Sequence, residues 1–240
     1  MPGPGLGLGE KATMQGFRRY AMYWVPSPGA WEAAAAEWLG WNPATGKVAL
    51  QPDLQVPLAV WTEEPRKYGF HGTVKAPFRL AEGWDRDRLS ASIRALCASL
   101  APVLLAGLSL RRIGSFLALT PDGGEAGLQA LAAEVVAGLD AARAPLTEAE
   151  VQKRRPERLS VDQRDLLDRW GYPYVMGEFR FHLSVSGSLA PADLDRLHPL
   201  AEAYFAPHLP RPLDIAELCL FGEAEDGRFH LVSRHRLGGG

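Results

Sequence analysis

Residues 70–75 read FHGTVK, and residues 179–186 read FRFHLSVS. Both stretches are rich in the aromatic and β-branched residues that favour extended structure, so each is predicted to form a β-strand. Each also holds a histidine followed two positions later by a threonine or a serine. Side chains alternate between the two faces of a strand, so this spacing places an imidazole and a hydroxyl side by side. The sequence therefore predicts the same polar pair on two strands.

The surroundings of the two pairs repeat as well. Each strand is followed by a helical pattern and then by apolar runs, in the order strand, helix, strand, strand. His71 precedes Phe116 by 45 positions, and His182 precedes Phe229 by 47. A unit this long exceeds a solenoid repeat, so the pattern indicates an internal duplication. Two halves that each supply a histidine and a hydroxyl predict one shared site for a phosphate.

The duplication divides the chain into segments. We expect a single domain over residues 17–237, preceded over residues 1–16 by a disordered tail rich in glycine and proline. Within the domain we expect a first repeat over about 67–121, a connector over about 141–174 and a second repeat over about 175–237. A chain of 240 residues with 47% hydrophobic content is able to bury a full core in this form.

Composition argues against several classes of protein. A formal net charge of -2 and a pI near 6.3 disfavour bulk nucleic-acid binding, so any such contact would be local, as at RNA ends. Cys97 and Cys219 belong to no CxxC pair, which fits buried thiols in a reducing compartment. Residues 1–16 have no long apolar core, so they predict neither a signal peptide nor a membrane span. We expect a cytoplasmic monomer without membrane contact.

The residue types point to acid and base chemistry on phosphate. A histidine pKa of about 6.5 suits either role at neutral pH, so His71 and His182 are able to divide the roles across one phosphodiester. Thr73 and Ser184 would hold the non-bridging oxygens, because hydroxyls donate hydrogen bonds without adding charge. Which histidine is the base stays open. No Asp, Glu or third His stands at ligand spacing near either one, so we predict no metal and no cofactor.

Three further residues are candidate substrate contacts. Lys75 extends the polar face of the first motif, and Arg180 extends that of the second. Either cation would neutralise phosphate charge or simply stand at a strand edge. Tyr68 joins the face of the first motif if that strand begins early, and it is then a substrate contact or a packed aromatic.

The segment 144–174 is the most basic part of the chain. Its cations include Lys153, Arg154, Arg155, Arg158, Arg164 and Arg169. One interpretation is a solvated helical connector whose cations pair with carboxylates such as Asp162, Asp165 and Asp168. The other is that some of these arginines cover the site and hold an extra phosphate. Both interpretations remain open on the sequence alone.

The motifs and their flanks resemble the two-histidine (2H) phosphoesterase superfamily, whose signature is a pair of His-x-Thr/Ser motifs on strands. The strings KYGFHGTVKAPF at 67–78 and WGYPY at 170–174, followed by FRFH at 179–182, are similar to the bacterial branch found beside carbon–phosphorus lyase genes. The resemblance spans residues 18–237. Ser184 stands where threonine is commoner, and it retains a hydrogen-bond donor.

The resemblance implies an α+β fold with two lobes and pseudo-twofold symmetry, in which duplicated antiparallel-sheet lobes carry helices outside and enclose a central cleft. It also implies cleavage of cyclic or linear phosphodiesters by the four motif residues. We therefore expect a metal-independent phosphodiesterase, a hydrolase acting on a small sugar or nucleotide phosphodiester, with a link to phosphonate metabolism. The alternatives are binding of phosphorylated metabolites or RNA ends without turnover, and RNA-end processing or ligation.

Overall fold

The computed structural model describes residues 16–238, so the tail predicted over residues 1–16 lies outside the described part of the chain except for Gly16. The strands β1 to β9 are Arg19–Trp24, Gly72–Phe78, Val103–Leu105, Leu108–Ile113, Phe116–Pro121, Leu183–Ser184, Leu213–Ile215, Glu217–Glu223 and Phe229–Arg236. The helices α2 to α9 are Ala30–Leu39, Leu58–Trp61, Glu63–Arg66, Arg86–Ser99, Glu125–Gly138, Glu148–Lys153, Val161–Trp170 and Pro191–Phe205. The predicted α+β class is confirmed.

Most of the described strands form one antiparallel sheet. Its order is β4-β5-β6-β2-β1-β8-β9, and β3 pairs separately with β7. Each of these pairings is antiparallel. The strands of the two histidine motifs, β2 and β6, are neighbours inside this sheet. The two predicted sheets are therefore halves of one continuous sheet that meet at β2 and β6.

The order of the elements follows the predicted duplication. The series β2, α5, β3 and the hairpin β4–β5 is matched by β6, α9, β7 and the hairpin β8–β9. The strands β3 and β7 hold equivalent places in the two series, and they pair with each other. The first apolar run after each helix was predicted as one strand, and in both halves it is divided into two.

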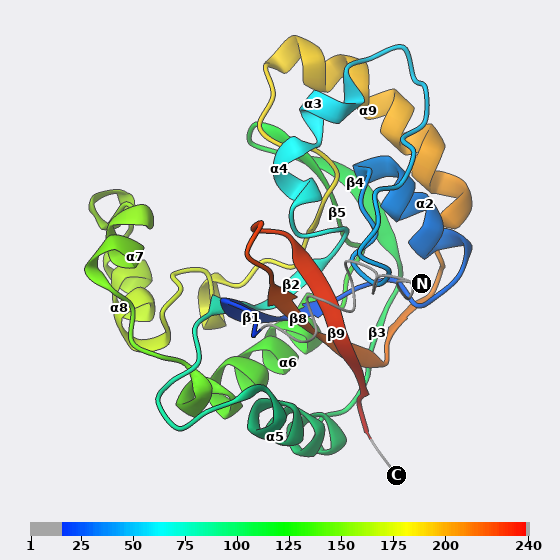
Figure 1. Ribbon diagram of the computed structural model, residues 1–240. Coiled ribbons are helices and arrows are strands. Elements are labelled where there is room, and N and C mark those ends of the chain that lie inside the picture. Colours follow the sequence, from blue (N-terminus) through cyan, green and yellow to red (C-terminus); the bar gives the residue numbers. More distant parts are fainter. Residues whose placement is uncertain (1–15, 239–240) are drawn as a thin grey trace, which may run out of the picture.

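The two repeats share one core. Helix α5 of the first repeat packs against β8 and β9 of the second, and α9 of the second packs against β4 and β5 of the first. Helix α6 packs against β2 and β3. Figure 1 shows α5 and α6 at one end of the molecule and α2 and α9 toward the other. Because α5 and α9 each pack against strands of the other repeat, neither repeat completes its hydrophobic core alone.

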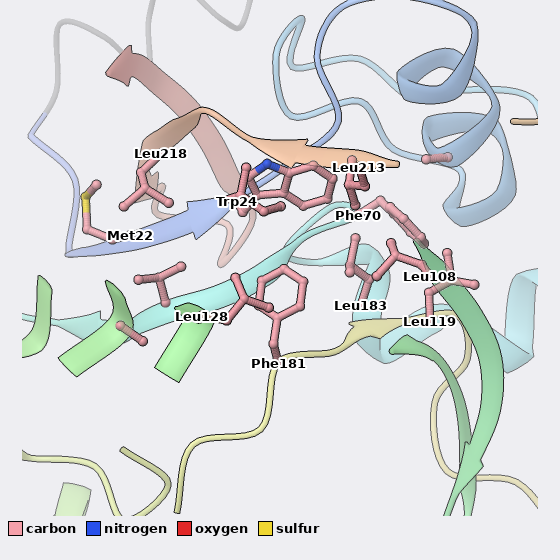
Figure 2. Packing of buried hydrophobic residues seen from close by; sticks show 14 of the residues in the cluster. Met22, Trp24, Phe70, Leu108, Leu119, Leu128, Phe181, Leu183, Leu213 and Leu218 are labelled. Carbon is pink, nitrogen blue, oxygen red and sulfur yellow. The ribbon is translucent and has the colours of Figure 1, made fainter. Parts of the chain in front are cut away.

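Strand β1 separates the main core from the face that carries the motifs. Met22 and Trp24 point into the main hydrophobic core, whereas Tyr23 belongs to a smaller cluster on the other face. Figure 2 shows Met22, Trp24 and Phe181 gathered in the main core, and the ring centroids of Trp24 and Phe181 lie 6.1 Å apart. The period of two along β1 thus explains which side of the sheet is left for a site.

A β-bulge in β2 changes the alternation beyond Thr73. In the ladder between β1 and β2, Tyr23 pairs with Thr73, but the next residue of β1, Met22, pairs with Lys75. One extra residue of β2 is accommodated between these pairs, so Lys75 turns to the core face with Met22. The prediction that Lys75 shares the face of His71 is wrong for this reason.

Strand β6 is shorter than the strand predicted over 179–186. Its ladder covers Leu183–Ser184, because β2 and β6 share the single pair Gly72–Leu183. The predicted apolar face is nevertheless buried, as seen at Phe179, Phe181, Leu183 and Val185. The chain before β6 therefore buries its apolar side chains in the core although its backbone pairs with no neighbouring strand.

The basic connector contains the helices α7 and α8, which agrees with the helical form that the first of the two interpretations expects. Figure 1 shows these two helices at the left edge of the molecule, well separated from α2 and α9. The predicted carboxylate pairing is wrong: within residues 16–238, none of Asp162, Asp165 and Asp168 forms an ion pair. The connector cations thus have other roles or remain solvated.

Cys97 and Cys219 are both buried and free, as predicted. Burial raises the pKa of the Cys97 thiol to about 11 and that of Cys219 to about 12, so both thiols stay protonated at neutral pH. Among the helices described, none has the length and apolar character needed to cross a bilayer.

Candidate active site

The register between β2 and β6 brings the two motifs together. Their middle residues, Gly72 and Leu183, pair across the ladder. In an antiparallel pair the next residues outward also face one another, so each histidine stands across from the hydroxyl of the other motif. His71 is thus opposite Ser184, and Thr73 is opposite His182. The four side chains form a compact polar group on one face of the sheet.

Both imidazoles are held by the same kind of hydrogen bond. Nδ1 of His71 lies 2.9 Å from the carbonyl oxygen of Gly69, and Nδ1 of His182 lies 2.9 Å from that of Arg180. A carbonyl oxygen only accepts, so Nδ1 must be the donor in each ring. Nε2 is therefore the nitrogen that each ring offers to a ligand, as an acceptor when neutral and as a donor when charged. The duplication extends to this detail.

Aromatic rings pack beside both histidines. The ring centroid of His71 lies 3.9 Å from that of Tyr23 and 5.7 Å from that of Tyr68. The ring of His182 lies 5.7 Å from that of Phe116. Such packing restricts the orientation of each imidazole, which supports the direction set by its Nδ1 bond.

The surroundings of His71 favour its neutral form. Burial lowers the pKa of His71 to about 4, and the nearby His182 acts in the same direction. The hydrogen bond to the carbonyl oxygen of Gly69 opposes this shift in the pKa. At neutral pH His71 therefore carries a free lone pair on Nε2.

The four motif residues line one cavity of about 410 Å³. This volume falls within the roughly 300–1,000 Å³ that is typical of small-molecule sites. Other side chains of its wall include Arg19, Tyr23, Glu64, Tyr68, Arg154 and Tyr172. Within residues 16–238 the hydroxyls of Thr73 and Ser184 have no hydrogen-bond partner in the protein, so both are available to a ligand.

Lys75 lies outside this cavity. Its side chain is buried, and Nζ donates to the carbonyl oxygen of Val136 at 3.0 Å and lies 3.9 Å from Oδ1 of Asp140. Val136 is in the last turn of α6, where a cation interacts favourably with the helix dipole. Burial lowers the pKa of Lys75 to about 8, and Asp140 opposes that shift in the pKa. Lys75 is a helix cap in the core.

Arg180 also lies outside the cavity of His71. Its Nη1 donates to the carbonyl oxygens of Gly177 and Phe179 at 3.1 and 2.7 Å. It lines a neighbouring cavity of about 320 Å³ to which His182 also contributes. Arg180 lies on the side of the chain away from the buried Phe179 and Phe181, as predicted, but it is absent from the wall of the cavity that His71 and His182 share, so its role as a substrate contact stays a prediction.

Sequence reasoning missed Arg19 and Tyr23, which line the cavity from β1. Both lie on the face of β1 opposite Met22, so the period of two along this strand could have shown that Arg19 and Tyr23 share a face. The missing information was the register, because only the pairing of β1 with β2 shows that this face meets the motifs.

The described residues offer no ready metal site. Across residues 16–238, no group of three or more His, Cys, Asp and Glu side chains is arranged to hold a metal ion. The polar side chains that line the cavity are two imidazoles, four serine and threonine hydroxyls, three phenols, two arginines and one glutamate.

Fold and site together define an α+β protein in which two repeated His-x-Thr/Ser motifs meet at one cavity. The chain belongs to the family described as "Protein of unknown function (DUF1045)", whose model matches residues 73–230. The match includes Thr73, His182 and Ser184, and it begins two positions after His71.

Two curated bacterial proteins are similar to the chain, and both are named ribose 1,5-bisphosphate phosphokinase PhnN. The protein of Janthinobacterium sp. (strain Marseille) is 36% identical over 226 residues, which cover 90% of this chain and 50% of the relative. That of Laribacter hongkongensis (strain HLHK9) is 33% identical over 214 residues, which cover 87% and 49%. The chain spans about half the length of these relatives, so their name describes proteins about twice as long.

Solved structures with similar arrangements include TT0787 of Thermus thermophilus, with a TM-score of 0.43 and 16% identity over 92% of this chain and 98% of that one. LigT of Escherichia coli, complexed with NADP+, has a TM-score of 0.43 and 12% identity over 93% and 99%. TM-scores below 0.5 at such low sequence identity carry no argument about activity, so the activity of this chain has to be inferred from its own site.

Proposed function

We propose that this chain is a metal-independent phosphodiesterase of the two-histidine type, which opens a cyclic phosphodiester of a small sugar or nucleotide. One observation carries the proposal: the same Nδ1 bond in both motifs leaves each Nε2 without a partner among the described residues, and both rings line one cavity. General acid–base catalysis needs a proton acceptor and a proton donor placed around one phosphorus. Two matched imidazoles on neighbouring strands suit that requirement.

The low pKa of His71 supports a division of roles. Neutral His71 takes a proton from the attacking water through Nε2, and the water oxygen forms a bond to phosphorus. The bond from phosphorus to a sugar oxygen breaks, and protonated His182 donates its Nε2 proton to that oxygen. Thr73 and Ser184 donate to the non-bridging oxygens, where negative charge gathers in the transition state. One water is consumed and one phosphomonoester is formed.

The name of the curated relatives supports a ribose substrate. Opening a cyclic phosphate on ribose yields a ribose phosphomonoester, the class of compound that their name gives as a kinase substrate. We therefore propose a ribose cyclic phosphate as the first compound to test, with a place in phosphonate metabolism. The kinase activity in that name belongs to the longer proteins.

The test is turnover of ribose and nucleoside cyclic phosphates in excess EDTA, followed by phosphorus NMR. We expect hydrolysis by the wild type, and a loss of about 100- to 10,000-fold in His71→Ala and in His182→Ala. His198→Ala is a matched control on α9, outside the cavity, and should keep full activity. Full activity in either motif variant would refute the proposal. Tight binding without turnover by the wild type would indicate a binding module instead.

A further inference from the structure

The cavity is larger than the reaction centre requires. Its 410 Å³ extends from the motif residues to a second wall, which we call the arginine–tyrosine wall. This wall consists of Arg19, Tyr23, Tyr68, Arg154 and Tyr172. A single phosphodiester group fills only part of such a volume, since one water takes about 30 Å³ in the liquid. The remaining space therefore accommodates a further portion of the ligand.

The charges on this wall are not all balanced. Arg19 forms a two-pronged ion pair with Glu223, in which Nη2 donates to Oε1 at 2.9 Å. Glu64 also lines the cavity, but it lies toward Gly187, where one of its side-chain atoms is 3.7 Å from the position of an added Cβ. Arg154 has no carboxylate within ion-pair distance among residues 16–238. Arg154 thus adds an unpaired positive charge to the cavity.

Arg154 is held by an aromatic ring instead of by a carboxylate. Its guanidinium carbon lies 4.8 Å from the ring centroid of Tyr172. A guanidinium over an aromatic face keeps its in-plane N–H donors free, and those donors match two oxygens of a phosphate. Tyr172 itself directly follows Gly171, whose left-handed backbone ends α8. The end of α7 and the end of α8 therefore present a cation and its platform together.

Phenol groups add neutral donors on the same wall. Within the described residues, the hydroxyls of Tyr23, Tyr68 and Tyr172 make no hydrogen bond to the protein. Burial raises the pKa of both Tyr23 and Tyr172, so both phenols stay protonated donors, and all three tyrosines line the same cavity as Arg154. A set of free hydroxyls around an unpaired arginine suits a multiply charged oxyanion.

We propose that Arg154 binds a second phosphate group of the substrate, so that the substrate carries a phosphomonoester in addition to the cyclic diester. This inference rests on the proposed function for the diester, and it names the substrate class as a phosphorylated sugar cyclic phosphate. It also assigns a role to the basic connector: of the six connector cations named above, Arg154 is the one that lines the cavity.

The test compares kcat/KM for a ribose cyclic phosphate with and without a phosphate on its 5-hydroxyl. We expect the wild type to prefer the phosphorylated compound by about 10- to 100-fold, as for a charged hydrogen bond. In Arg154→Ala this ratio should fall toward one, and Arg154→Lys should restore part of it. Arg158→Ala removes an exposed connector cation outside the cavity and should keep the wild-type ratio. An equal ratio in the wild type and Arg154→Ala would overturn the proposal.

Failure of the proposed function has a different signature. If the wild type hydrolyses neither compound, calorimetric binding of ribose 5-phosphate to the wild type and to Arg154→Ala tests the phosphate subsite directly. A Kd at least about 10-fold weaker in the variant would support the subsite without the activity. An unchanged Kd, or no binding by the wild type, would overturn the subsite as well.

Discussion

The ring of Phe181 occupies the space where a side chain of Gly72 would stand. A Cβ added at Gly72 would lie 2.4 Å from two ring carbons of Phe181. Phe181 is itself a buried member of the main core, close to Trp24. The middle residue of the first motif is therefore glycine for a reason of packing, and the contact joins the two motif strands on the side opposite the cavity.

Replacing Gly72 by alanine should destabilise the protein. The added methyl group has to displace the Phe181 ring, and overpacking of this kind costs about 1–3 kcal/mol. Urea unfolding followed by fluorescence measures the change. Gly177→Ala is the matched control, because nothing lies within 4 Å of a Cβ added there. A Gly72→Ala protein as stable as the wild type would contradict the packing argument.

The neutral form of His71 should make the fold sensitive to acid. Its pKa is about 4 in the folded protein and about 6.5 in an unfolded chain, so between these values the unfolded chain binds a proton that the folded protein does not. The free energy of unfolding therefore falls as the pH drops from 6.5 to 4, by at most about 3 kcal/mol from this residue.

His71→Asn should lose this part of the acid sensitivity, since an amide does not titrate and still donates a hydrogen bond. Urea unfolding at several pH values between about 4 and 7 measures the difference between variant and wild type. As the pH falls, the free energy of unfolding of His71→Asn should rise relative to that of the wild type. A constant difference across this range would mean that the pKa of His71 is not lowered by folding.

The same pKa predicts the acid side of the rate profile if His71 is the base. The profile of kcat/KM reports groups of the free enzyme, so activity should fall with acid near pH 4. Initial rates on a ribose cyclic phosphate from about pH 3.5 upward measure this limb. A midpoint near about 6.5 would instead assign the base to a histidine with an ordinary pKa.

Lys75 should matter for stability and not for turnover. Lys75→Met keeps much of the apolar stem but leaves the carbonyl oxygen of Val136 without its donor, which costs about 1–3 kcal/mol. Thermal unfolding and kcat/KM on the same preparation separate the two effects. A large loss of kcat/KM with unchanged stability would restore Lys75 as a substrate contact.

Local patterns carried the prediction of the motifs and of the duplication. The period of two along a strand is a local property, so it correctly placed the apolar face of residues 179–186, and it placed His71 beside Thr73. It failed at Lys75 because the bulge in β2 depends on pairing with β1, far away in the sequence. The same period put Arg180 on the side away from the buried Phe179 and Phe181, but it did not show that Arg180 lines a neighbouring cavity instead of the one that holds His71.

For the second wall of the cavity, one of the two sequence interpretations placed connector arginines over the site, but it did not identify which arginine. Arg154 and Tyr172 meet because α7 and α8 turn back toward the motifs, and a string of basic residues does not reveal such a path. Tyr23 was recognisable as part of an alternating strand but not as a neighbour of His71. Side chains that meet through tertiary pairing need the register, which sequence periodicity does not supply.

The two motif hydroxyls, Thr73 and Ser184, should matter for turnover. Thr73→Val and Ser184→Ala largely preserve the shape of each side chain but remove its hydroxyl donor. Each hydroxyl stands across the ladder from the histidine of the other motif. If the hydroxyls bind the charge of the transition state, each change should lower kcat by about 100- to 1,000-fold while KM changes little. Thr120→Val is the matched control, because the buried Oγ1 of Thr120 has no hydrogen-bond partner within residues 16–238 and lies outside the cavity of His71. That control should keep full activity and equal or higher stability. Variants that raise KM with kcat intact would show that the hydroxyls bind the ground state and transition state equally.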